Sequence, residues 1–445
     1  MKLYVPQTHI ADDEGFSQEK DIFRRKEFGE RLAKLIENSN DDLVIALDSN
    51  WGGGKTTFIK MWQGYVQHQR SPAFKTFYFD AFQNDYQQDP FLALITELYQ
   101  LLENEPEAKK KLFKEKASNV AKSLFRGSLK LGTRTATGGL LDGTIIDHIE
   151  EDISKLVSEQ VDSIIEERLN NSVKDKNALF EFRAHLENIA KQEEETVVFI
   201  IDELDRCKPD FALKLIEQIK HLFSVPGITF LLVLNRTQLE ESIKSEYGNG
   251  INASEYLQKF VNLWLTLPRK IDLEQFHSND DGVKYVRHVF KEMLNEGEED
   301  PNLDSINLLC ELVKFNKPSF REIEQILSYF AVIRNLSKPN TKYYPHYQVI
   351  YAFLAYVRVN NPSLFKKINN QELKPEELIS AAGLTRVVGN NYIQHLKDCI
   401  TFDLSDDDIK HSMLEEKRIS FDMYHGKHTS MIKIVCNWLT ELDIG

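Results

Sequence analysis

The residue types best suited to chemistry form a glycine-rich turn that ends in Lys55 and Thr56. This turn, SNWGGGKTT, follows the apolar run LVIALD (43–48) and precedes a helical pattern from about residue 58 to 69. Consecutive glycines let backbone N–H groups wrap an anion, and the following helix aims its N-terminus at it. The pattern is typical of binding polyphosphate and Mg²⁺. The residues expected to contact a nucleotide are Asn50, Trp51, Gly52, Gly53, Gly54, Lys55, Thr56 and Thr57.

The roles within this turn follow from residue chemistry. Lys55 would neutralise the β- and γ-phosphates, and the Thr56 hydroxyl would ligate Mg²⁺. Ser49 stands where the usual pattern G-x-x-x-x-G-K-[ST] has its first glycine. Because that position opens the turn and contacts phosphate less directly, we expect serine to be tolerated.

An acidic pair follows a second buried run, TVVFIID (196–202). Ligands of open α/β sheets bind at the carboxyl ends of the strands, so Asp202 is expected beside the glycine-rich turn. There it would hold Mg²⁺ through water. Glu203 would polarise the attacking water as a general base and so act as a catalytic residue. The alternative is that the two acids only cap the next helix.

Strand patterns alternate with helical patterns, which indicates βαβ units and a parallel sheet. One strand lies between the glycine-rich turn and the acidic pair, and the glutamate directly follows the aspartate. Both traits fit the additional-strand, catalytic-glutamate division of P-loop NTPases, with strand order 5-1-4-3-2. We therefore expect a three-layer α/β sandwich with a helical insertion and a C-terminal helical region. The predicted strands are 43–48, 74–82, 196–202, 228–234 and 260–268.

Polar residues after other strands are further candidates for the same edge. Asn235, at the end of ITFLLVLN, would orient water near the γ-phosphate; it would also suit the cap of the next helix. Arg206 and Arg236 are candidates for an arginine finger. The alternative for Arg206 is an ion pair with Asp205. Lys259 is a weaker finger candidate.

Composition sets the broad class of the chain. Its 445 residues suggest about two to four domains. A hydrophobic fraction of 42% and a formal charge of −14 indicate a globular protein that is no general nucleic-acid binder. The four cysteines form no CxxC pair, and neither a secretion signal nor a membrane-spanning run is present, so we expect a cytoplasmic protein.

Residues 104–178 interrupt the strand–helix alternation and are interpreted as an inserted helical arm. Residues 109–134 hold nine Lys/Arg against Glu115 alone. This run would suit nucleic acid or an anionic membrane surface. The alternative, which we favour, is a solvated face or pairing with the acidic stretch 147–167.

Taken together, the motifs resemble the KAP family of P-loop NTPases. The resemblance runs from DIFRRKEFGERLAKLI through NWGGGKTTFIKMW, FYFDAFQNDYQQDPFLAL and IIDELDRCKPD to VLNRTQLEESI and ASEYLQKFVNLWLTLP. It covers about residues 20–270, with a weaker stretch at 315–335. Two positions depart from the family pattern: Asn235 stands where an aspartate is common, and KPSFREIEQIL replaces a Pro-Arg pair.

The resemblance implies ATP, rather than GTP, as the nucleotide. It also implies that Arg321 is the γ-phosphate-sensing arginine; the alternative is a solvent-facing helix residue. The family insertion often carries transmembrane helices, but here its least polar part includes Lys130, Arg134 and Asp142, so the chain looks like a soluble form. Soluble prokaryotic members are similar to proteins implicated in defence against phages and plasmids.

The sequence thus predicts an ATPase whose nucleotide state controls self-assembly into a homo-oligomer or contact with a partner protein. The predicted domains are an NTPase domain (1–270), a helical lid (271–340) and a C-terminal helical domain (341–445). Three alternatives stay open at this point: a non-turnover ATP-dependent switch, a nucleic-acid-stimulated ATPase, and a membrane-surface tether.

Overall fold

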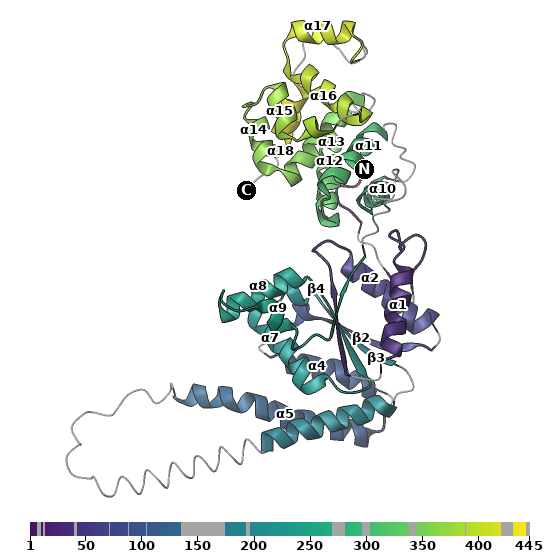
Figure 1. Ribbon diagram of the computed structural model, residues 1–445, viewed down its shortest axis with the longest axis vertical. Coiled ribbons are helices and arrows are strands. Elements are labelled where there is room, and N and C mark those ends of the chain that lie inside the picture. The colour runs from purple at the N-terminus through teal and green to yellow at the C-terminus, as the bar shows by residue number, and fades with distance from the viewer. Residues whose placement is uncertain are drawn as a thin grey trace, which may run out of the picture. The chain divides into compact units, whose positions relative to one another are not determined.

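The computed structural model divides into two compact units (Figure 1). The sheet unit comprises Glu27–Ser49 and Trp62–Leu267, and the helical unit comprises Met1–Lys26, Asn50–Met61 and Pro268–Gly445. The predicted domain ranges, which follow the chain order, stay predictions. The structure describes residues 1–6, 10–11, 14–39, 42–70, 72–87, 89–103, 105–134, 174–192, 196–268, 281–295, 303–337, 345–387, 389–419 and 430–441.

The sheet unit is built on five parallel strands in the order β2-β3-β4-β1-β5. This is the predicted order 5-1-4-3-2 read from the other edge, so the predicted fold class is confirmed. In-register pairing sets Asp80 beside Asp202 and Asp48 beside Leu234, which brings the carboxyl ends of four strands to one edge. The strands are β1 (Leu43–Asp48), β2 (Phe74–Asp80), β3 (Thr196–Asp202), β4 (Ile228–Leu234) and β5 (Leu263–Thr266).

Helices cover both faces of this sheet, as its doubly buried central strands require. Helix α1 (Lys26–Glu37) lies on one face (Figure 1). Its Gly29 carbonyl accepts a hydrogen bond from Trp62 Nε1 at 2.9 Å. On the other lie α4 (Pro90–Tyr99), α7 (Pro209–Gln218) and α8 (Arg236–Tyr247) (Figure 1). Two short helices, α3 (Ala81–Asn84) and α9 (Ala253–Leu257), complete the connections.

The described parts of the predicted insertion are helical. Helix α5 (Glu107–Arg134) packs against a helix over residues 174–192, with the Phe113 and Phe182 rings 5.9 Å apart. The side chains of α5 are described as far as Leu124, and the acidic stretch 147–167 lies outside the described residues. No helix among the described residues is long and apolar enough to span a membrane.

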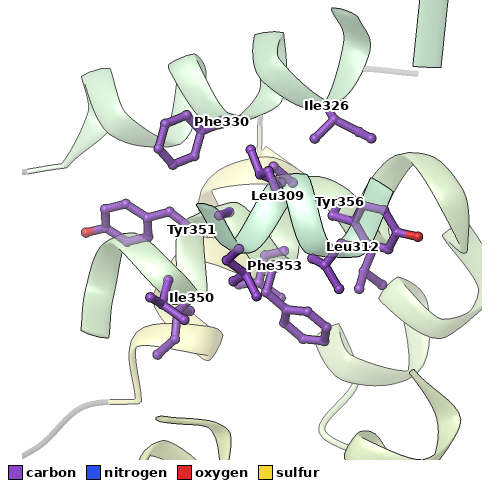
Figure 2. Packing of buried hydrophobic residues seen from close by; sticks show 14 of the residues in the cluster. Leu309, Leu312, Ile326, Phe330, Ile350, Tyr351, Phe353 and Tyr356 are labelled. Atoms are coloured by element: carbon purple, nitrogen blue, oxygen red, sulfur yellow. The ribbon is translucent and has the colours of Figure 1, made fainter. Parts of the chain in front are cut away.

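The helical unit is organised around α13 (Pro345–Asn360), which contacts α11 (Leu303–Asn316) and α12 (Phe320–Leu336). Ile326 and Phe330 of α12 lie against Leu309 of α11 within this core, beside Tyr351 of α13 (Figure 2). The remaining helices are α10 (Asp281–Met293), α14 (Pro362–Asn369), α15 (Pro375–Ala381), α16 (Asn391–Leu404), α17 (Asp407–Glu415) and α18 (Met431–Glu441).

The N-terminal segment belongs to the helical unit and contacts both ends of α12. Asn335 Nδ2 donates to the Met1 carbonyl at 3.0 Å, and the Phe23 ring stacks on Phe320 with centroids 4.5 Å apart. Asp21 then accepts hydrogen bonds from the backbone N–H groups of Arg25 and Lys26. The segment thereby brings Arg25 to the glycine-rich turn.

Candidate functional site

The glycine-rich turn begins directly after β1. The Ser49 N–H donates to the Leu234 carbonyl at 3.2 Å, which ties the start of the turn to the end of β4. Gly52 and Gly54 have φ angles of +68° and +76°, a region that residues with a Cβ adopt at a cost. Helix α2 (Lys55–Gly64) then begins at the lysine. The sequence therefore uses glycine where the backbone conformation needs it.

Protein donors fix two carbonyls of this turn within the helical unit. The Phe320 N–H donates to the Gly52 carbonyl at 3.3 Å, and Arg25 Nη1 donates to the Gly53 carbonyl at 3.1 Å. Arg25 is only 3% exposed, and its guanidinium lies 4.7 Å from the Phe23 ring centroid. Because C=O and N–H of one trans peptide point in opposite directions, the bond from Arg25 turns the Gly54 N–H away from Arg25.

The predicted phosphate-contacting side chains lie on this turn and on the first residues of α2. Lys55 Nζ is 3.4 Å from the Asn50 carbonyl, and the Gly53 N–H donates to the same oxygen at 3.0 Å. Trp51 is 43% exposed. Arg321, in the first turn of α12, lies against Gly52: a Cβ on this glycine would come within 3.0 Å of the arginine's backbone nitrogen and Cβ. The structure thus brings Arg321 to the phosphate turn.

Asp202 is fully buried at the end of β3. Its Oδ1 accepts from the Glu203 N–H at 2.8 Å, and its Oδ2 accepts from the Tyr78 hydroxyl at 3.0 Å. Tyr78 pairs with Ile200 on β3, so its hydroxyl reaches Asp202 as a diagonal cross-strand neighbour. Burial and the Asp202 charge raise the pKa of Tyr78, which keeps the hydroxyl a donor to this carboxylate.

Glu203 occupies the left-handed region with φ +61°, which is uncommon for a residue with a side chain. Strain of this kind, roughly 1–3 kcal/mol, is often found at functional sites. Burial raises the pKa of Glu203, the Asp202 charge raises it further, and Arg206 opposes both effects. Arg206 forms an ion pair with Glu203 through Nε and Oε2. This partner differs from the Asp205 considered in the sequence.

Asn235 and Arg236 have structural partners at the end of β4. Asn235 is buried, and its side chain caps α8 by accepting from the Gln238 N–H at 3.4 Å. The Arg236 guanidinium bonds Glu240 at 2.8 Å and lies 4.5 Å from the Trp264 ring centroid. These contacts hold Arg236 within its own unit. A water-orienting role for Asn235 stays a prediction.

Some lysines of the basic run on α5 pair with nearby acids. Lys109 bonds Glu105 at 2.8 Å, and Lys116 bonds Glu181 at 2.6 Å. Lys114 lies 4.7 Å from the Tyr99 ring centroid. These acids lie outside the stretch 147–167, so the predicted pairing with that stretch stays a prediction. The side chains of Arg126, Lys130 and Arg134 lie outside the described residues.

Neither Arg25 nor Tyr78 is among the site residues predicted from the sequence. Arg25 lies within DIFRRKEFGERLAKLI, part of the family resemblance, but nothing in that run distinguishes it from Arg24. Tyr78 and Asp202 are 124 residues apart and meet only because β2 pairs with β3 in a specific register. Side chains alternate along a strand, so Tyr78 is expected on the face of the sheet opposite Phe77 and Phe79. This alternation could have marked Tyr78 as a candidate site residue.

The strand order, the phosphate turn after β1 and the acidic pair after β3 define a P-loop NTPase of the additional-strand type. Residues 25–337 match the KAP family P-loop domain, so the chain belongs to the KAP family, whose P-loop fold is that of nucleotide-binding proteins. The resemblance seen in the motifs is thereby confirmed.

Two solved structures are similar to the chain at low sequence identity. No curated protein matches the chain. The chain is similar to the ORC2 protein of Aeropyrum pernix in ADPNP–ADP complexes, with 13% identity, 98% of this chain and 97% of that chain covered, and a TM-score of 0.35. It is also similar to Drosophila ORC bound to DNA, with 11% identity, coverages of 93% and 87%, and a TM-score of 0.39. Scores this low transfer no function to the chain.

Proposed function

We propose that the chain binds ATP with Mg²⁺ and hydrolyses it. The observation that carries the proposal is the acidic pair at the end of β3: a buried, doubly hydrogen-bonded Asp202 next to a strained Glu203 with a raised pKa. Perturbed carboxylates at the carboxyl edge of a parallel sheet are typical of catalytic sites. Membership of the KAP family supports nucleotide binding, and the acidic pair supports hydrolysis.

The phosphate turn would hold the triphosphate. Its positive-φ glycines and the N-terminus of α2 offer backbone N–H groups, and Lys55 adds a positive charge. The buried cation of Arg25 adds a second positive charge behind the turn. Asn50, Trp51 and Thr57 would complete the contacts with the nucleotide.

The oxygen ligands proposed for Mg²⁺ are the Thr56 hydroxyl and, through water, the Asp202 carboxylate. Both are hard donors of the kind Mg²⁺ prefers, and this ion is commonly bound by one or two carboxylates together with substrate phosphates. The fit rests on Asp202, whose two hydrogen bonds fix its orientation before any ligand arrives. Bound Mg²⁺ would neutralise charge on the β- and γ-phosphates.

Glu203 would take a proton from the attacking water. Burial and the Asp202 charge raise its pKa, which makes the Glu203 carboxylate a stronger base than an ordinary glutamate. The ion pair with Arg206 must open or shift for Glu203 Oε2 to accept this proton. Asn235 would orient the water, and Arg321 would contact the γ-phosphate from α12.

We further propose that nucleotide state controls self-assembly into a homo-oligomer or contact with a partner protein. The support is that Arg321 of α12, in the helical unit, lies against Gly52 of the phosphate turn. Loss of the γ-phosphate would therefore remove a contact of the helical unit. The resemblance to soluble prokaryotic KAP proteins suggests a setting in defence against phages or plasmids.

A second candidate function is a non-turnover ATP switch. The observation that favours it is the Arg206–Glu203 ion pair, which occupies the proposed base. In this case ATP would bind and change the assembly state, but Glu203→Gln would leave the slow turnover unaltered.

The test measures steady-state ATP turnover against protein concentration, for wild type and Glu203→Gln, together with sedimentation of both proteins. Assembly-controlled hydrolysis predicts a specific rate that climbs with concentration in wild type and collapses in the variant. A flat, negligible rate with ATP still bound supports the switch instead. A chain that binds no ATP at all contradicts both candidates.

A further inference from the structure

A pocket of about 610 Å³ lies within the helical unit, along one face of α12. Small-molecule sites commonly enclose about 300–1,000 Å³. The residues at 321, 325, 328 and 332 recur every three or four positions, so they share this face. Ile326 and Phe330 lie on the other side of the helix, in the core (Figure 2). The lining includes Arg321, Gln325, Ser328, Tyr329 and Val332 of α12 and Arg358 of α13.

Among the residues that the structure describes, the lining carries two arginines and one acid, Glu324. Glu324 already accepts a hydrogen bond from the Tyr285 hydroxyl. The Arg358 guanidinium lies 5.9 Å from the Tyr329 ring centroid and 5.0 Å from that of Phe365. These two rings hold the guanidinium in place and lower the entropy lost when it binds an anion.

Three polar side chains on the α12 face are available to a ligand. Arg321, Gln325 and Ser328 make no side-chain hydrogen bond or ion pair with any residue in the described part of the chain. Arg321 and Gln325 are exposed, and Ser328 is partly buried. Beside them, Tyr329 and Val332 supply a ring and an apolar wall.

We propose that this pocket binds a small phosphate-bearing ligand of nucleotide size. The two guanidinium groups suit a phosphate, which accepts their paired N–H donors. Gln325 and Ser328 would hydrogen-bond the polar rim of the ligand, and its ring would pack on Val332 and Tyr329. This site is separate from the phosphate turn in its residues except for Arg321. Arg358 is therefore the residue that identifies it.

The test uses the full chain with Lys55→Ala, which removes the proposed ATP lysine, and with no other nucleotide present. The probes are the radiolabelled nucleoside monophosphates AMP, GMP, CMP and UMP, measured by equilibrium dialysis. We expect saturable binding of at least one probe at one site per chain. Arg358→Gln should weaken it about tenfold or more, as the loss of a charged hydrogen bond implies.

Gln325→Glu provides a second, milder variant, because it adds a negative charge at an exposed position of similar shape. It should weaken binding about threefold to fivefold. The matched control is Gln258→Glu, the same change at an exposed position in the sheet unit, which should leave binding unaltered. Unfolding midpoints of all variants report that they fold.

Binding that both pocket variants weaken and the control leaves intact supports the proposal. No saturable binding of any probe, or binding indifferent to Arg358→Gln and Gln325→Glu, overturns it. A negative result in this binding test would leave the proposed ATPase activity standing. That activity is tested by ATP turnover in wild type and Glu203→Gln, and it requires neither Arg358 nor Gln325.

Discussion

Replacing Gly52 with alanine tests how the phosphate turn is held against α12. Gly52 has φ +68°, and an added Cβ would lie 3.0 Å from both the backbone nitrogen and the Cβ of Arg321. Those atoms belong to the helix framework, so they cannot move aside as a flexible side chain would. Gly52→Ala therefore forces either the turn or the first turn of α12 to shift.

The magnitude can be worked from a matched control, Gly383→Ala. Gly383 has φ +70° in the same unit, but no atom lies within 4 Å of its added Cβ. The left-handed conformation alone costs an alanine about 1–2 kcal/mol. Crowding in a packed site costs about 1–3 kcal/mol more. Gly383→Ala should thus lose about 1–2 kcal/mol of unfolding free energy, and Gly52→Ala about 2–5 kcal/mol.

The assay is urea unfolding followed by circular dichroism, with ATP affinity measured by calorimetry on the same samples. Gly52→Ala should also bind ATP at least about tenfold more weakly, because a shift in the turn misplaces its N–H donors. Gly383→Ala should bind ATP as the wild type does. Equal destabilisation by both variants, together with equal ATP affinity, would refute the reasoning about this contact.

Three further predictions follow from single contacts. Arg25→Lys keeps the charge but loses the planar donor to the Gly53 carbonyl, so ATP affinity should fall by about 1–3 kcal/mol in calorimetry; unchanged affinity would contradict this role. Arg206 opposes the raised pKa of Glu203, so Arg206→Gln should raise that pKa and move the acid limb of the kcat/KM profile to higher pH. A limb that stays in place or moves to lower pH would count against Glu203 as the base. Burial raises the pKa of the Cys207 thiol, so iodoacetamide should label it in the native chain near neutral pH far more slowly than in urea; equal rates would show it accessible.

Strand prediction succeeded where strands are buried on both faces. The bounds predicted for β1, β3 and β4 match the structure, because continuous apolar runs leave little doubt about length. The run 74–82 was predicted two residues too long. The chain leaves β2 at Asp80, whose side chain accepts from the Gln83 N–H at 2.9 Å and caps α3.

Helix starts were harder to predict where a polar side chain competes for the backbone. The periodicity of residues 21–37 predicted one helix, but α1 begins at Lys26. Asp21 accepts from the N–H groups of residues 25 and 26, and Arg24 adopts φ +53°, which together make a turn. The same turn directs Arg25 to the Gly53 carbonyl, so the missed boundary and the missed residue share one cause.

The residues of the candidate site divide in the same way. Motif spacing predicted the places of the acidic pair and the glycine-rich turn, which directly follow strands β3 and β1 in the structure; their functional roles stay predictions. The partner of Arg206 was not predictable, since Asp205 is adjacent and Glu203 lies three residues away. In the structure, Arg206 pairs with Glu203, and Glu203 adopts the left-handed conformation. Residue spacing does not encode this conformation.

The measurement that tests the central claim most directly is γ-phosphate release in a single turnover, with ATP binding measured in the same samples. Wild type and Glu203→Gln are compared at equal concentration with Mg²⁺ present. The account predicts that both bind ATP with affinities within about threefold, while the variant releases phosphate at least about 100-fold more slowly. Equal release by the two proteins would contradict the assignment of Glu203 as the base of an ATPase.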